Sequence, residues 1–205
     1  MSLEGNLSLG KAAIDHVKCF RLQSSNQRSN RIASLGGVEA AIKSPRRVGI
    51  HDEGPLAERI LDLRNHGKLA ANRLKIFWLA ERAKAAGIGN CTEASSVVFQ
   101  FLCQKNVRPI DIMSFTNPVY DHVWVVIGLA GDGLQLRRHR NGGPRVNLRD
   151  WGPEAVWVDG WQNGGCCFAV DDLVKGKVRN LRWQSGLHSA EAIEAGFPDS
   201  FFGSL

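Results

Sequence analysis

The chain lacks several features that assign a protein to a class at once. It has no CxxC motif, which argues against a zinc ribbon. It also has no apolar run approaching about 18 residues, so no segment is expected to span a membrane. Its first residues contain neither the apolar stretch nor the small-residue cleavage site of a secretory signal peptide. No internal repeat occurs.

What is present is ordinary for a globular protein. The 205 residues are 43% hydrophobic and 22% charged, enough for one domain with a sizeable core. Five cysteines, an odd number, argue against a disulfide scaffold and favour a reducing compartment. The 26 Lys and Arg against 20 Asp and Glu give a net charge of +6, which permits an acidic partner or nucleic acid but requires neither.

The two ends of the chain differ in composition. Residues 1–53 include a run of Ser, Asn, Gln and Arg at 23–30 with little to bury, so we predict a loosely ordered N-terminal extension there. We predict one folded domain over residues 54–205. Its C-terminal tail, from Ser189 onward, is expected to form one short helix and a Phe-rich end that docks on the core.

Hydrophobic spacing within the domain changes part-way along the chain. Apolar residues at helical spacing predict helices from Pro55 to Gly67, from Leu69 to before Gly87, and from Cys91 to about Lys105. After Pro109 the pattern favours strands over 110–116, 121–129, 134–138 and 155–161. Helices followed by closely spaced strands predict the α+β class, a mostly antiparallel sheet packed on helices.

Three segments carry candidate catalytic residues. In Gly89-Asn90-Cys91-Thr92-Glu93, Asn90 is a good N-cap and Glu93 completes a capping-box pair. Cys91 then falls at the first helical position, where the helix dipole favours a thiolate. The alternative is a buried structural cysteine beside an ordinary cap.

The other two segments are strands. In 121–129, Val123, Val125, Ile127 and Leu129 form the core-facing side and His122 lies on the other face with Trp124. In 155–161, Asp159 lies between two tryptophans on one face, where a carboxylate needs a partner. An imidazole would serve, although Asp159 could equally begin a turn at Gly160.

Together these residues form a candidate Cys-His-Asp triad. A nucleophile at a helix start, a base on one strand and an orienting carboxylate on a later strand are the parts of such a site. The order and motifs, Gly-Asn-Cys-x-Glu, Asp-His-Val-Trp and Trp-Val-Asp-Gly-Trp, resemble the papain-like and transglutaminase-like cysteine enzyme superfamily, over roughly residues 75–165. Bacterial type III effector deamidases and proteases are the closest in character.

The resemblance implies a role for each residue. Cys91 would be the nucleophile, His122 the general base and acid, and Asp159 the group that fixes the imidazole. The sequence departs from papain at the oxyanion position, where Ala85 replaces the glutamine, and from transglutaminases at Thr92, which replaces a tryptophan. The Cys91 N–H is one oxyanion donor; Asn90 or Trp161 is the second, and Trp124 is a further candidate for the substrate groove.

Two other features suggest no separate chemistry. A basic loop is formed by Arg137, Arg138, His139 and Arg140. It could hold phosphate or an acidic protein, but a solvated loop is favoured. A nucleic-acid site would have aromatic residues between these cations, and the loop has none. Cys166 and Cys167 are adjacent, which does not suit a tetrahedral metal site, so a structural role is favoured. We expect no metal and no cofactor.

The functional expectation is a thiol hydrolase that acts on carboxamide bonds of a protein substrate. A protein glutamine deamidase of the effector type is favoured, and a cysteine protease of the same superfamily is the alternative. A second kind of function is a catalytically silent binding module that uses a Trp-lined groove or the basic loop to hold a partner. The effector resemblance implies synthesis in a bacterial cytoplasm and action in a host cytosol, with residues 1–53 as a secretion leader.

Overall fold

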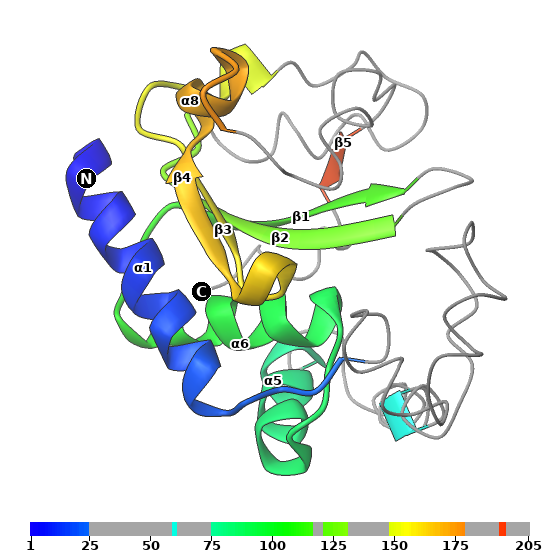
Figure 1. Ribbon diagram of the computed structural model, residues 1–205. Coiled ribbons are helices and arrows are strands. Elements are labelled where there is room, and N and C mark those ends of the chain that lie inside the picture. Colours follow the sequence, from blue (N-terminus) through cyan, green and yellow to red (C-terminus); the bar gives the residue numbers. More distant parts are fainter. Residues whose placement is uncertain (25–58, 61–74, 117–120, 131–147, 179–192, 196–205) are drawn as a thin grey trace, which may run out of the picture.

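The computed structural model describes residues 1–24, 59–60, 75–116, 121–130, 148–178 and 193–195 (Figure 1). The helices are α1 (Leu3–Cys19), α5 (Lys75–Ala86), α6 (Cys91–Gln104) and α8 (Val170–Val174), with 3₁₀ turns η2 (Leu148–Trp151) and η3 (Gln162–Gly164). The strands are β1 (Ile110–Thr116), β2 (Asp121–Ile127), β3 (Val156–Asp159), β4 (Cys166–Ala169) and β5 (Ile193–Ala195).

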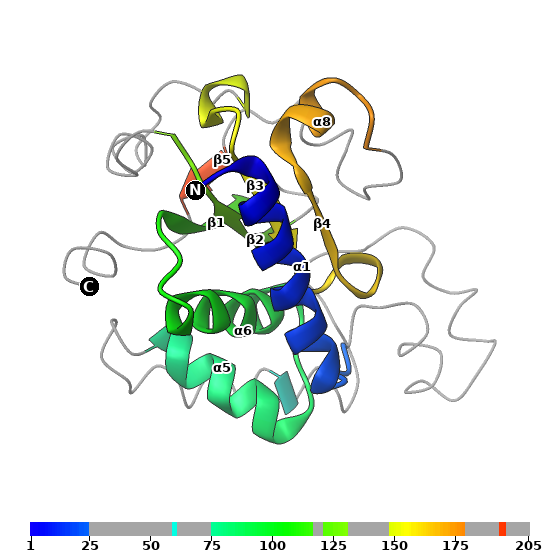
Figure 2. The same ribbon diagram turned by 90° about the vertical axis from the view of Figure 1, so that its left-hand side faces the viewer.

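The strands form one antiparallel sheet in the order β4-β3-β2-β1-β5. Helices α1 and α6 pack against the sheet, and α5 packs on the side of α6 that faces away from it (Figures 1 and 2). The α+β class predicted from the sequence is therefore confirmed. Helix α6 lies between α5 and the sheet. Packing on both of these sides fixes the position of its first residue, Cys91.

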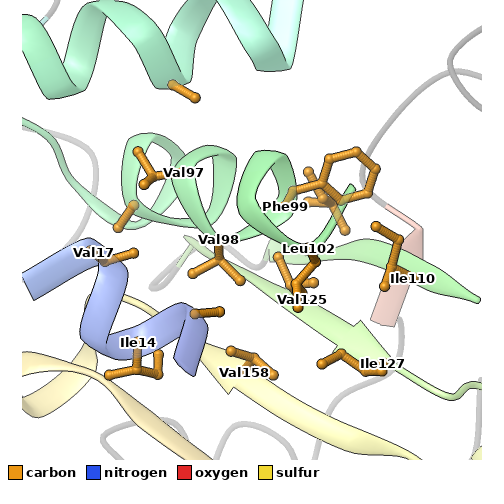
Figure 3. Close-up of a cluster of buried hydrophobic side chains, with 14 of the residues drawn as sticks. Ile14, Val17, Val97, Val98, Phe99, Leu102, Ile110, Val125, Ile127 and Val158 are labelled. Carbon is orange, nitrogen blue, oxygen red and sulfur yellow. The ribbon is translucent and has the colours of Figure 1, made fainter. Parts of the chain in front are cut away.

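The main core lies between this helical layer and the sheet (Figure 3). Helix α6 contributes Val98 and Leu102, one turn apart, and the strands contribute alternate residues such as Val125 and Val158. The predicted apolar face of β2 is confirmed at Val125 and Ile127. It was wrong at Leu129, which belongs to a second cluster, because Gly128 takes a φ of 74° and breaks the alternation after the strand ends.

That second cluster covers the opposite face of the sheet. It contains Trp124, Trp157, Trp151 and Leu173, all 2% exposed or less. Trp124 and Trp157 stack with their ring centroids 4.0 Å apart and 8° between the ring planes. The two clusters cover opposite faces of β3, so the side chains of this strand are buried along its whole length.

The N-terminal segment differs most from the prediction. Residues 3–19 form α1, which is capped by Ser2 through a Gly5 N–H to Oγ hydrogen bond of 3.3 Å. Its Ile14 and Val17 are buried in the main core, and each such side chain contributes about 1.5–3 kcal/mol when removed from water. The prediction of a loosely ordered extension was therefore wrong for residues 3–24. Residues 25–53 lie outside the described part of the chain.

Some of the remaining predicted elements agree with the structure and others do not. Helix α6 and strands β1, β2 and β3 lie where periodicity predicted them, to within two residues at most ends. Strand β4 was not predicted, and residues 193–195, within the tail for which one short helix was expected, pair with β1 as β5. The predicted strand 134–138, the basic loop and the Phe-rich end lie outside the described residues. No described helix is long and apolar enough to cross a membrane.

Candidate active site

Cys91 is the first residue of α6, as the capping pattern predicted. The side chain of Glu93 turns back to accept a 2.9 Å hydrogen bond from the backbone N–H of Asn90, which closes the helix start. The free N–H groups of this first turn point out of the helix start, and the helix dipole favours negative charge at that end. Cys91 is 6% exposed.

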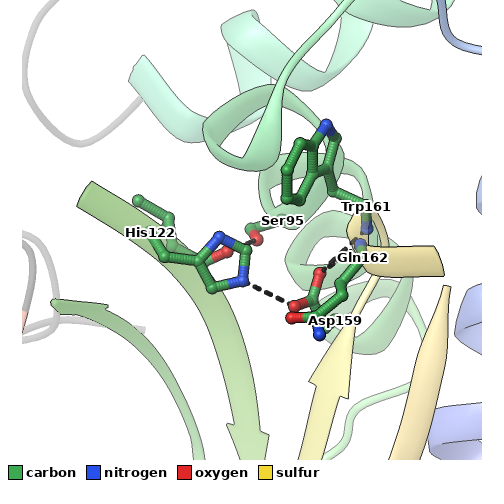
Figure 4. Close-up of polar contacts among 6 residues, drawn as sticks. Ser95, His122, Asp159, Trp161 and Gln162 are labelled. Atoms are coloured by element: carbon green, nitrogen blue, oxygen red, sulfur yellow. Dashed lines mark hydrogen bonds and ion pairs between the residues drawn. The ribbon is translucent and has the colours of Figure 1, made fainter. Parts of the chain in front are cut away.

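His122 and Asp159 meet in the buried region beside this helix start (Figure 4). Asp159 Oδ2 lies 2.5 Å from His122 Nε2, and the two residues are 0% and 1% exposed. Asp159 Oδ1 accepts hydrogen bonds from the backbone N–H groups of Trp161, at 2.9 Å, and Gln162, at 3.0 Å. The carboxylate therefore fills both roles considered for it, since one oxygen orients the imidazole and the other holds the turn after β3.

The electrostatic balance at His122 brings Cys91 into the same site. Burial alone lowers the pKa of His122, but the charge and hydrogen bond of Asp159 and, after them, the hydrogen bond and charge of Cys91 raise that pKa to about 10. The Cys91 thiol thus contributes to the electrostatics of the imidazole, after the carboxylate. Because Nε2 is directed at Asp159, Nδ1 is the nitrogen on the opposite side of the ring.

Two contacts explain why these elements converge. Ser95 Oγ donates a 2.9 Å hydrogen bond to the carbonyl of Val123, which ties the first turns of α6 to β2 beside His122 (Figure 4). Gly160 follows Asp159, and a Cβ added there would lie 3.0 Å from a methyl of Val98 and 3.2 Å from a helix carbonyl. The absence of a side chain at Gly160 lets α6 approach the end of β3 closely.

A second polar network borders the nucleophile. The indole N–H of Trp161 donates to Ser24 Oγ at 2.7 Å, and Ser24 Oγ donates to Asn90 Oδ1 at 2.8 Å. The indole N–H is therefore already engaged, so the prediction of Trp161 as the second oxyanion donor does not fit this arrangement. Asn90 stays as the candidate. Nothing in the sequence indicated Ser24, because it lies in a polar run that has no periodicity of its own.

Trp124 does not line an open groove. It is 0% exposed, stacked between Trp157 and the His122 ring, whose centroid lies 5.9 Å away. Trp161 is 4% exposed and its ring centroid lies 5.5 Å from that of His122. The groove predicted from these tryptophans is thus a packed aromatic wall behind the imidazole. Its physical effect is to exclude water from the His122–Asp159 pair.

Comparisons with known proteins give no assignment. No protein-family model, curated protein or solved structure matches this chain. The geometry of the site and the sequence motifs are therefore what indicate a function.

The other thiols and carboxylates do not form a competing centre. All five cysteines are free, and burial raises the pKa of both Cys166 and Cys167, that of Cys167 to about 11. A raised pKa leaves these thiols protonated and weakly nucleophilic, as expected for structural cysteines. Within the described part of the chain, no cluster of three or more His, Cys, Asp or Glu could hold a metal ion.

Proposed function

We propose that this protein is a cysteine-dependent hydrolase in which Cys91 is the nucleophile, His122 the general base and acid, and Asp159 the orienting carboxylate. The observation that carries the proposal is the buried His122–Asp159 pair, together with the Cys91 thiol at a helix start, which also helps to raise the pKa of His122. This is the arrangement that activates a thiol as a nucleophile.

The proposed reaction has two stages. The Cys91 thiolate attacks the carbon of a carboxamide, and the negative charge moves to the carbonyl oxygen. The C–N bond then breaks, and His122 gives its proton to the departing nitrogen, leaving a thioester. Water attacks the thioester with His122 as base, which releases a carboxylic acid and restores the thiol.

The same chemistry serves a glutamine side chain and a peptide bond. We favour deamidation of a protein substrate by an effector-type enzyme, with proteolysis as the alternative, on the sequence resemblance to the papain-like superfamily. The placement of the nucleophile at a helix start and of His122 and Asp159 on neighbouring antiparallel strands supports a papain-like core. Residues of the segment 3–24 pack in the main core, so this segment is part of the folded domain, and secretion into a host cytosol stays a proposal.

The pH dependence of Cys91 alkylation tests the triad. Iodoacetamide labelling, read peptide by peptide by mass spectrometry, compares Cys91 with exposed Cys19 in the same sample. The pH of half-maximal rate is the quantity to compare, because restricted access slows alkylation at every pH alike, whereas burial by itself would raise that pH and an activating partner would lower it. We expect a lower half-maximal pH for Cys91 than for Cys19 in the wild type, and loss of that difference in His122→Gln.

The opposite result refutes the proposed function. If Cys91 reaches its half-maximal rate at the same pH as Cys19 or higher, and His122→Gln leaves that pH unchanged, the three residues are not an activated triad. A binding module then becomes the better explanation. If the triad is confirmed, intact mass of a candidate substrate separates the two activities, because deamidation leaves one chain whereas proteolysis leaves two fragments.

A further inference from the structure

The segment that follows α1 is paired with the loop that precedes the nucleophile. The backbone N–H of Gln23 donates to the carbonyl of Gly87 at 2.9 Å, and the N–H of Gly89 donates to the carbonyl of Gln23 at 2.9 Å. Gln23 and Ile88 form a parallel bridge. Residues 87–89 lead directly into Asn90, so this pairing fixes the backbone from which Asn90 and Cys91 extend.

Ser24 continues this contact with its side chain. It is 1% exposed and lies between the indole of Trp161 and the carboxamide of Asn90, which is 66 residues away in the sequence. An indole N–H can only donate, so the Ser24 oxygen accepts from it and the Ser24 proton is directed at Asn90. The Asn90 atom that faces Ser24 must then be the oxygen, which sets the NH₂ group at the other end of the carboxamide.

We propose that Ser24 is a positioning residue of the active site, which orients the Asn90 carboxamide so that its NH₂ group donates to the oxyanion beside the Cys91 N–H. This inference rests on the proposed function. It assigns the second oxyanion donor to Asn90 because the Trp161 indole is held by Ser24. It also makes the N-terminal segment, far from Cys91 in the sequence, a component of the site.

Two reactions of the same sulfur separate an oxyanion effect from a general one. Iodoacetamide alkylates Cys91 by displacement of iodide at a saturated carbon, and no oxyanion forms. With p-nitrophenyl acetate, the thiolate adds to the carbonyl carbon, an oxyanion forms and p-nitrophenolate leaves, so that Cys91 becomes an acetyl thioester. The ratio of the acylation rate to the alkylation rate at Cys91 therefore reports oxyanion stabilisation alone.

We expect Ser24→Ala to lower that ratio about 10-fold, with the pH profile of alkylation unchanged. Ser24→Thr keeps the hydroxyl and should recover most of the ratio. Asn90→Asp can still accept from Ser24 but has no NH₂ group to donate, so it should lower the ratio about 100-fold or more. Ser96→Ala is the matched control, because Ser96 is equally buried in α6 and, among the described residues, its hydroxyl bonds to the Thr92 carbonyl, at 2.8 Å.

A double variant tests whether Ser24 acts through Asn90. In the Asn90→Ala background, Ser24→Ala should cause no further fall in the ratio. An unchanged ratio in Ser24→Ala, or in Asn90→Asp if the first variant does not fold, overturns the inference and leaves the triad in place. Absence of any activated alkylation of Cys91 in the wild type overturns the proposed function itself, so the two failures are distinguishable.

Discussion

The buried His122–Asp159 pair makes the stability of the protein depend on pH in a defined direction. Burial lowers the pKa of His122, but Asp159 and Cys91 more than offset it and raise that pKa to about 10, against 6.5 in the unfolded chain. Between these values the native state holds a proton that the unfolded state has lost. The free energy of unfolding therefore falls as the pH rises, by roughly 2–3 kcal/mol from about pH 7 to about pH 9.

The variant Asp159→Asn should reverse this dependence. The asparagine oxygen can still accept the N–H groups of Trp161 and Gln162, but the negative charge beside the imidazole is gone. Burial then dominates, so the pKa of native His122 falls below its unfolded value. The contribution of His122 in this variant is complete at alkaline pH and is lost as the pH decreases below about 6.5.

Urea unfolding followed by tryptophan fluorescence at several pH values measures both effects. The control is Asp171→Asn, which removes an exposed carboxylate that pairs with Lys175 at 2.5 Å and should leave the alkaline dependence as in the wild type. The reasoning is refuted if wild type and Asp159→Asn lose the same stability between about pH 7 and about pH 9.

Two further predictions concern α1. Gly10→Ala should lower the free energy of unfolding by about 1–3 kcal/mol, because its Cβ would lie 2.5 Å from Cys167 Sγ. The control Gly5→Ala has 3.4 Å to its nearest neighbour and should not lower it; equal thermal stability of the two variants contradicts the packing argument. Deletion of residues 1–24 uncovers the main core and should abolish cooperative thermal unfolding, whereas a cooperative transition at the wild-type temperature contradicts an integral α1.

The elements that periodicity located are those whose signals are local. The cap of α6 is specified by residues three apart, Asn90 and Glu93, and the apolar stripe behind it repeats over several turns. Strands β1 and β2 are seven residues each, and β2 carries a run of apolar, β-branched and aromatic residues typical of a strand. Such patterns depend only on neighbours in the chain, so they are legible before any tertiary contact is known.

The elements that were missed depend on contacts far along the chain. Helix α1 meets the sheet through Gly10 and Ala13, small residues whose burial reflects close approach and gives little hydrophobic signal. Strand β4 has only four residues and is a strand because β3 pairs with it. Ser24 is significant only because Trp161 and Asn90 are brought to either side of it.

The sequence alone determined the α+β class, the helix that begins at Cys91, and the strands that carry His122 and Asp159, because capping and alternation are properties of short segments. The tertiary structure decided that Asp159 meets His122 across a gap of 37 residues. It also set the hydrogen-bond partners of both Asp159 oxygens, bonded the Trp161 indole to Ser24, and packed α1 into the core. These depend on strand pairing and on close approach at Gly160, which no local pattern encodes.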